Sequence, residues 1–319
     1  MADTRTRRIA KFIEPLRVEP GSTVDLARDF DPRYKGSLRK RDGAGLLSTG
    51  VSLLAEYQAR LAAQDTYGVL LCLQALDAGG KDGTIRHVMS GVNPQGVRVS
   101  SFKVPSSEEL DHDYLWRYAQ RLPERGEIAI FNRSHYEEVL VVRVHPEVLR
   151  RQKLPERPKA AGIWERRYRE INDWERYLTD NGFKVVKVFL NLSEEEQRTR
   201  FLKRIDLPEK NWKFSAADVR ERRHWDEYQE AFSEMLSATS TKHAPWYVVP
   251  ADRKWFARIC AAAVLVHTLM EIDPQYPTLG DEARRDLLTV RRELEAEAPE
   301  GAAADPYAAR RRTKDARRP

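Results

Sequence analysis

The sequence is poor in cysteine and has no long hydrophobic run. Two of its 319 residues are cysteines, Cys72 and Cys260, too few for a disulfide framework or a structural zinc site. No apolar stretch approaches the roughly 18–20 residues that span a bilayer, and the first residues lack the apolar region of a signal peptide. These absences predict a cytoplasmic protein in a reducing compartment, without a membrane partner.

Signatures of a histidine metal site and of a serine or cysteine nucleophile are also missing. The seven histidines show no H-E-x-x-H or comparable ligand spacing, and no G-x-S-x-G nucleophile motif occurs. Charge, in contrast, is abundant: 33% of the residues are charged and the net charge is +6. A basic balance favours a polyanionic partner, which can be nucleic acid, an anionic lipid surface or a phosphate-rich substrate.

Short apolar strands alternate with helical patterns along the chain. This alternation is typical of a parallel sheet covered on both faces, so we expect an α/β fold with a doubly wound, mostly parallel, five-stranded sheet. The predicted strands are 69–73, 97–101, 128–131, 185–190 and 246–249. The predicted helices are about 45–63, one starting near 84, about 107–121, 163–181, one starting at 193, one starting at 215, and about 254–270.

The composition divides the chain into three parts. Residues 1–42 are a polar, irregular N-terminal extension, and 43–275 form the predicted catalytic domain. Residues 276–319 are a tail that we expect to be partly disordered, because its end is rich in Ala and Arg without periodicity. Residues 153–162, with two prolines, predict a loop.

The most informative segment joins the first predicted strand to the next helix. It is a glycine-rich loop with a lysine, made of Asp77, Gly79, Gly80, Lys81 and Gly83. Such a loop makes a cradle of backbone N–H groups at a helix N-terminus, where phosphate binds. An ordinary strand-to-helix turn remains the alternative.

The loop departs from the P-loop pattern G-x-x-x-x-G-K-[ST]. The first position falls on Ala75 and the last on Asp82, so the hydroxyl that usually contacts magnesium is absent. Asp77, inside the loop, could hold the metal instead.

Asn132 and Arg133 follow the third predicted strand. Sites in parallel sheets lie at the carboxyl ends of the strands, so both residues should face the glycine-rich loop. P-loop proteins often have a magnesium-organising carboxylate at this place, and an arginine beside it can bind phosphate oxygens in a bidentate manner. The alternative is a structural Asn in a turn next to a surface Arg.

A second basic cluster lies at 200–215, between two predicted helices and within a predicted lid at about 200–222. Its cations are Arg200, Lys203, Arg204, Lys210 and Lys213. A helical lid of this kind could close over phosphates, exclude water and add positive charge. A solvated basic helix end is the alternative explanation.

With these motifs assembled, the chain closely resembles the type-2 polyphosphate kinase family. The resembling segments are 75–85, 109–117, 131–137, 206–215 and 246–254, so that the likeness spans about residues 40–270. The resemblance implies a P-loop kinase-like three-layer α/β/α fold with a helical lid. Apolar helix faces also predict a homo-oligomer, either a dimer or a tetramer.

The resemblance further implies reversible, magnesium-dependent phosphoryl transfer between inorganic polyphosphate and purine nucleotides, with Mn²⁺ able to substitute. The implied catalytic residues are Asp77, Lys81, Arg133 and Arg204, and Asp77 and Glu137 are the implied metal ligands. Implied phosphate-binding residues are Gly79, Gly80, Lys81, Asp82, Gly83, Thr84, Arg133, Lys203, Arg204, Lys210 and Lys213. Implied nucleotide-binding residues are Arg117, Asn132, Arg133 and Glu137.

One departure within the family bears on the acceptor. Where many members have Asp-Arg-Ser, this chain has Asn132, Arg133 and Ser134, which resembles the subgroup that phosphorylates nucleoside mono- and diphosphates. Loss of a carboxylate removes repulsion toward an approaching phosphate. We therefore expect AMP to be converted to ADP and ADP to ATP, with guanine nucleotides also accepted.

Two other functions compete with this interpretation. An ATP-dependent nucleoside monophosphate kinase of the thymidylate-kinase type would share the fold, but it would have a conventional P-loop. A non-enzymatic nucleic-acid binder would explain the net charge but would leave Asp77, Lys81 and Arg133 unexplained. No recognised nucleic-acid motif is visible, so no specific nucleic-acid partner is expected.

Overall fold

The computed structural model describes residues 4–155 and 162–308. The chain divides into two units, 1–275 and 276–319, and each is described by itself. The predicted loop at 153–162 lies largely outside the described residues.

The first unit is built on a five-stranded sheet with the order β2-β3-β1-β4-β5. Every neighbouring pair is parallel, as the alternation of strands and helices predicted. The strands are β1 (Gly68–Gln74), β2 (Val97–Ser101), β3 (Ile128–Asn132), β4 (Phe183–Asn191) and β5 (Trp246–Pro250).

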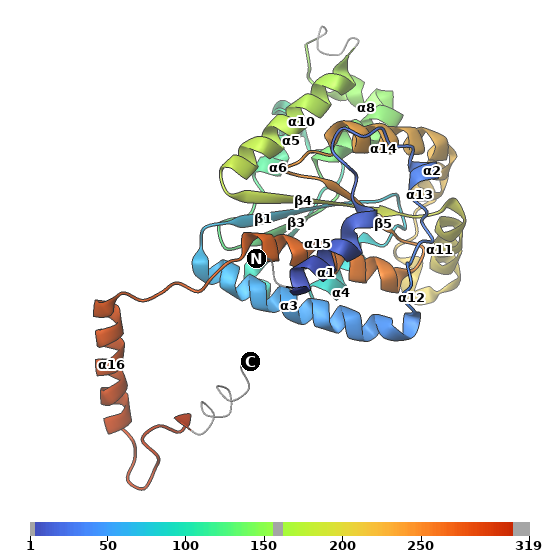
Figure 1. The fold of residues 1–319 in the computed structure, drawn as a ribbon. Helices are drawn as coiled ribbons and strands as arrows, with labels where there is room; N and C mark the ends of the chain where they lie inside the picture. The colour runs from blue at the N-terminus through green and yellow to red at the C-terminus, as the bar shows by residue number, and fades with distance from the viewer. Residues whose placement is uncertain (1–3, 156–161, 309–319) are drawn as a thin grey trace. The chain divides into compact units, whose positions relative to one another are not determined.

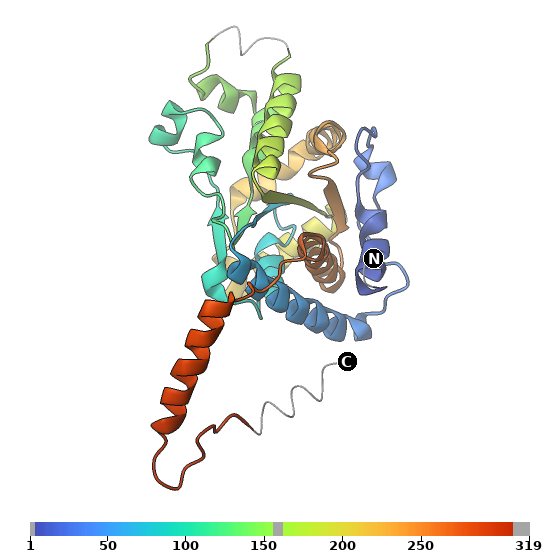
Figure 2. The same ribbon diagram turned by 60° about the vertical axis from the view of Figure 1, so that its left-hand side comes forward.

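Helices cover both faces of the sheet and make three layers (Figures 1 and 2). One face carries α1 (Thr4–Ile13), α3 (Gly43–Gln64), α4 (Lys81–Val88) and α15 (Lys254–Ile272). The other face carries α10 (Ile163–Asp180) and α14 (Trp225–Thr239). Alternate residues of a strand point to opposite sides of the sheet, so the continuous apolar run in β1 makes both faces apolar. Val69 and Leu71 pack in one core, and Leu70 and Cys72 pack in the other.

Helix α15 is long and apolar enough, by composition, to cross a membrane. Most of that apolar stretch is buried inside the fold, where it packs against α3, β4 and β5. Its hydrophobicity is therefore accounted for by its place in the core of the first unit.

The predicted helix at 107–121 is wrong: the structure has two short helices there, α5 (Ser107–Asp111) and α6 (Trp116–Ala119). The capping residue of α5 is Ser106, which forms a capping box with Glu109. The carboxylate of Asp113 accepts a hydrogen bond from the backbone N–H of Leu115 at 2.9 Å. This local turn competes with a continuous helix.

The N-terminal extension is more regular than its polar sequence suggested. Ile13 and Leu16 are buried in the core with α15, and Arg17 forms an isolated antiparallel bridge to Tyr247 in the edge strand β5. The extension contains α1, η1 (Glu14–Leu16), α2 (Leu26–Asp29) and η2 (Lys40–Asp42).

Short helices fill most of the connections at the carboxyl end of the sheet. After β4, helix α11 (Glu194–Asp206) leads into the lid elements α12 (Pro208–Asn211), α13 (Ala216–Glu221) and η5 (Arg222–His224). After β3 come η4 (His135–Val139), α7 (Val141–Val144) and α8 (Pro146–Arg151). At the opposite end of the sheet, η3 (Pro94–Gly96) directly precedes β2.

The second unit contains helix α16 (Asp281–Ala296), so part of the tail is helical rather than irregular. None of its residues is buried. The apolar side chains that it exposes are Leu287, Leu288, Val290 and Leu294.

Candidate active site

The glycine-rich loop between β1 and α4 has the geometry of a phosphate cradle. Gly80, which precedes α4, has a φ of +103°, a conformation that L side chains rarely adopt. A Cβ at Gly79 would lie 2.5 Å from the Cβ of Ala75 and 2.8 Å from the carbonyl oxygen of Leu76. No side chain fits at Gly79, so the loop can bring its backbone close to an anion.

Lys81 is the first residue of α4, and its ammonium group donates to the carbonyl oxygen of Ala75 at 2.7 Å. Burial lowers the pKa of Lys81 to about 8, and the nearby positive charge of Arg133 acts in the same direction. A phosphate bound in the cradle would place a negative charge next to this ammonium group and would raise its pKa.

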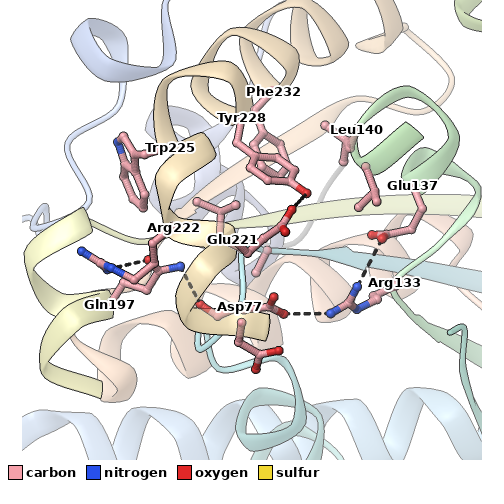
Figure 3. A pocket seen from close by; sticks show the side chains of 14 residues that line it. Asp77, Arg133, Glu137, Leu140, Gln197, Glu221, Arg222, Trp225, Tyr228 and Phe232 are labelled. Atoms are coloured by element: carbon pink, nitrogen blue, oxygen red, sulfur yellow. Dashed lines mark hydrogen bonds and ion pairs between the residues drawn. The ribbon is translucent and has the colours of Figure 1, made fainter. Parts of the chain in front are cut away.

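Arg133, directly after β3, reaches the same loop (Figure 3). Its guanidinium group lies between two carboxylates: Nη2 is 2.8 Å from Asp77 Oδ1 and Nη1 is 3.4 Å from Glu137 Oε2. The charges of Glu137 and Asp77 raise the pKa of Arg133. The backbone of Arg133 has a φ of +65°, a strained conformation that costs about 1–3 kcal/mol and is typical of functional sites.

The carboxylate of Asp82 is used for contacts within the protein, and the phosphate binding predicted for Asp82 stays a prediction. Its carboxylate accepts hydrogen bonds from Asn132 Nδ2 at 2.9 Å and Lys213 Nζ at 3.3 Å. Burial opposes ionisation here, but these hydrogen bonds outweigh it and lower the pKa of Asp82. The side chain of Asp82 therefore joins α4, the end of β3 and the lid, and its backbone N–H alone is suited to phosphate.

The lid, which consists of the last turns of α11 and the elements α12, α13 and η5 after it, brings further cations to the loop. Arg204 Nη1 lies 3.3 Å from Asp218 Oδ2 within the lid. Lys203 and Lys210 also face the cleft between the lid and the cradle, and their side chains have no ion pair or hydrogen bond within the described part of the chain. The lid thus presents positive charge that is not neutralised by its own acidic residues.

These elements enclose a cleft of about 880 Å³. Of the site residues predicted from the sequence, all but Glu137 and Arg117 line it. The residues that line the cleft include Asp77, Gly79, Gly80, Lys81, Asp82, Gly83, Thr84, Arg86, Asn132, Arg133, Arg200, Lys203, Arg204, Lys210, Trp212, Lys213, Lys254 and Arg258.

Glu137 and Arg117 lie elsewhere. Glu137 lines a smaller pocket, shown in Figure 3, that shares Asp77 and Arg133 with the cleft. Arg117 lines a separate cavity, where it is buried and donates to the carbonyl oxygen of Lys103 at 2.9 Å. Its side chain holds the segment after β2 in this structure, and the nucleotide contact predicted for Arg117 stays a prediction.

Arg200 is a functional candidate that its spacing did not distinguish from the neighbouring cations. Its side chain is 5% exposed, and Nη1 donates to the carbonyl oxygens of Ala78 and Gly79, both at 3.0 Å. Gln197, one turn earlier, donates to the carbonyl oxygen of Asp77 at 3.0 Å. Helix α11 thereby binds the carbonyl groups of the loop. The N–H group of Gly79 donates to the carbonyl oxygen of Leu76, so the N–H groups after it, at the start of α4, are the ones suited to an anion.

Asp77 and Glu137, the residues predicted to bind metal, are suited to an ion whose other ligands come from the substrate and water. Among the described residues, no group of three or more His, Cys, Asp and Glu side chains could hold a metal ion. Asp77 and Glu137 are two hard oxygen donors on either side of Arg133. Magnesium in phosphoryl-transfer sites is commonly bound by one or two carboxylates, and phosphates and water complete its coordination.

A glycine cradle facing an arginine and a basic lid, on a parallel α/β sheet, is the architecture of the P-loop kinase-like phosphotransferases. The comparison with known sequences gives the family. The chain belongs to the Polyphosphate kinase 2 family, whose model matches residues 38–277.

Two relatives and one solved structure are similar over most of the chain. An ADP-polyphosphate phosphotransferase of Rhodopseudomonas palustris is 49% identical over 283 residues, 88% of this chain and 97% of that protein. An AMP/ADP-polyphosphate phosphotransferase of Meiothermus ruber is 46% identical over 267 residues, 83% of this chain and 96% of that protein. The crystal structure of Polyphosphate Kinase 2 from Arthrobacter aurescens has a TM-score of 0.78 at 40% identity, covering 87% of this chain and 96% of that one.

Proposed function

We propose that this protein transfers the terminal phosphoryl group of inorganic polyphosphate to nucleoside mono- and diphosphates, reversibly and with Mg²⁺. The observation that carries the proposal is the cleft itself, in which the glycine cradle, Arg133 and the basic lid face one another. An excess of cations over carboxylates suits a polyanionic donor better than a neutral one. The names of the two relatives support polyphosphate and adenine nucleotides as the substrates.

Phosphoryl transfer depends on placement and charge neutralisation more than on covalent chemistry. In the proposed reaction, Lys81 and the loop N–H groups bind the donor phosphates, and Arg133 binds oxygens of the phosphoryl group in transfer. Arg204 adds positive charge from the lid. A nucleotide phosphate is ionised near neutral pH, so the acceptor needs no strong general base.

Asp77 and Glu137 would hold Mg²⁺, or Mn²⁺ in its place, and the ion would neutralise charge on the phosphate oxygens. Both carboxylates contact Arg133, so the ion and the guanidinium group would act on the same phosphates. Asn132, in place of a carboxylate, spares an approaching phosphate from repulsion, which supports the use of both AMP and ADP.

The test is phosphorylation of AMP, ADP, GMP and GDP with long-chain polyphosphate as the donor, with and without Mg²⁺. We expect all four acceptors to react, and we expect Lys81→Ala to lower kcat/KM by at least about 100-fold because a preorganised charge is removed. Reaction of diphosphates alone would contradict the role given to Asn132. Activity with ATP but not with polyphosphate would contradict the proposal and favour a nucleoside monophosphate kinase.

A further inference from the structure

Helix α16 of the second unit exposes an apolar stripe along its whole length. The stripe consists of Ala283, Leu287, Val290 and Leu294, which are spaced by four, three and four residues. This is the spacing of the d and a positions in a heptad repeat, written a to g, and it puts the four side chains on one face. Leu287, Val290 and Leu294 are 49–62% exposed, and none of the residues of α16 is buried. A regular apolar face without cover predicts a partner.

The polar residues of α16 favour a protein helix over a membrane surface as that partner. The helix carries five acidic and four basic residues, whereas helices that lie on membranes are rich in Lys and Arg on their polar face. An apolar seam with both signs of charge beside it is instead typical of a coiled coil. Helix α16 also lies after residue 277, where the match to the family model ends.

The charges on either side of the apolar stripe are sorted by sign. The g positions hold Asp286 and Glu293, and the e positions hold Arg284 and Arg291. In parallel helices in register, a g residue faces the e residue of the next heptad in the neighbouring helix. Asp286 of one copy would therefore face Arg291 of another. In antiparallel helices, g faces g and e faces e, which would bring like charges together. The charge pattern of α16 is thus complementary to a second, parallel α16.

The flanking charges are available for this contact. The carboxylate of Asp286 makes no hydrogen bond or ion pair within the described part of the chain. The side chain of Arg291 is 44% exposed, with Nε 2.8 Å from Glu295 Oε1 and Nη2 2.8 Å from Asp305 Oδ2. Exposed ion pairs of this kind contribute little to stability, so Arg291 can exchange one of them for Asp286 of a neighbouring copy.

We propose that α16 binds the α16 helices of other copies of this chain in a parallel bundle, with the apolar stripe at its centre. The contact between g and e positions is the same between neighbours in a bundle of two, three or four helices, so the orientation follows from the charges whatever the number of copies. This surface lies in the second unit and takes no part in the proposed reaction. It gives the chain a self-association site separate from the catalytic unit.

Disulfide trapping in the full-length chain tests both the partner and its orientation. Both native cysteines are buried, so a cysteine placed in α16 is the reactive one. In a parallel bundle each d position faces itself in the neighbouring copy, so Val290→Cys should form a disulfide-linked dimer under mild oxidation. Thr289→Cys is the matched control, since Thr289 is exposed on the outer side of the helix. It should cross-link at least about tenfold more slowly, because its sulfur atoms do not meet within the bundle.

Equal rates for Val290→Cys and Thr289→Cys would overturn the bundle, because random collisions would explain both. The absence of a cross-link from either variant would overturn it as well and would leave α16 to a different partner. An antiparallel seam puts a positions next to d positions. Faster cross-linking between Leu287→Cys and Val290→Cys chains than between two Val290→Cys chains would therefore overturn the parallel orientation.

Charge reversal in the Val290→Cys chain tests the contact between g and e positions. Asp286→Arg should slow the cross-linking by about fivefold, because attractive contacts become repulsive. Arg291→Asp should act in the same way, and a mixture of the two variants should restore the original rate for the mixed dimer, which mass spectrometry distinguishes. Glu282→Arg, an exposed residue at a c position of the same helix, is the control for net charge. An equal effect of Glu282→Arg, or no recovery in the mixture, would overturn the pairing of Asp286 with Arg291.

Discussion

Lys81 carries the positive charge of the cradle in surroundings that weaken it. Burial, together with the charge of Arg133, lowers its pKa from the ordinary value of 10.5 to about 8. Below pH 8 the free protein therefore has the cation, and above pH 8 it progressively loses it. An anionic phosphate stabilises the charged form, so binding should be accompanied by proton uptake at alkaline pH.

This shift predicts the alkaline limb of the pH profile. We expect kcat/KM for polyphosphate to fall above about pH 8, approaching a tenfold loss per pH unit, because kcat/KM reports the ionisation of the free enzyme. In Lys81→Arg, whose guanidinium group does not titrate in this range, the limb should move out of the accessible range even if the rate is lower throughout. A limb that stays at the same pH in Lys81→Arg would assign the ionisation to a different group.

The cations of the lid cannot be told apart from the sequence alone. Arg200, Lys203 and Arg204 are neighbours in one helical run, and charge patterning treats them alike. In the structure Arg200 is buried against the carbonyl groups of Ala78 and Gly79, whereas Lys203 faces the cleft. The difference arises from where α11 meets the loop, about 120 residues away in sequence, and no local pattern contains that contact.

Strand β4 places a lysine in the core beneath the segment that carries Arg133. Lys187 is fully buried and donates to Glu175 Oε2 at 2.6 Å, to the hydroxyl of Tyr136 at 2.9 Å and to the carbonyl oxygen of Thr239 at 2.6 Å. Tyr136 belongs to η4, three residues after Arg133. The buried pair therefore connects β4 and α10 to the element that positions the site.

Breaking this pair from one side should be costly. We expect Lys187→Met to lower the free energy of unfolding by about 3–5 kcal/mol, because Glu175 would remain buried without its cation, in contact only with the Tyr136 hydroxyl and His135. The double variant Lys187→Met/Glu175→Leu should recover most of that loss. Urea denaturation measures both, with Lys184→Met in the same strand as the control. A double variant as unstable as the single one would contradict this account.

The elements were predicted well where local patterns determine them. Continuous apolar runs identified all five strands, including β4 in spite of Lys187, because strands buried on both faces require such runs. The prediction of one helix over 107–121 is wrong because Asp113 makes a turn there. The polar sequence of 1–42 predicts an irregular extension, but Ile13 and Leu16 are buried. Those residues are ordered by packing against α15, a contact far away in sequence.

The molecule as a whole consists of a catalytic unit and a separate C-terminal unit. The described residues that line the cleft all come from 1–275, and α16 buries none of its side chains. We expect a chain ending at Gln275 to keep its kcat/KM, with a free energy of unfolding within about 0.5 kcal/mol of the full chain. Activity assays and urea denaturation of the two chains check this, and a loss in either would assign the tail a part in the first unit.

Both cysteines of the chain are buried, and burial raises the pKa of each thiol. Since the thiolate is the reactive form, neither should react readily with maleimide dyes while the protein is folded. The chain is therefore a natural background for site-specific labelling. A single cysteine introduced at the exposed Glu209 of α12 would take a fluorophore at that position alone, so that lid movement could be followed in real time without removing a native residue from the core.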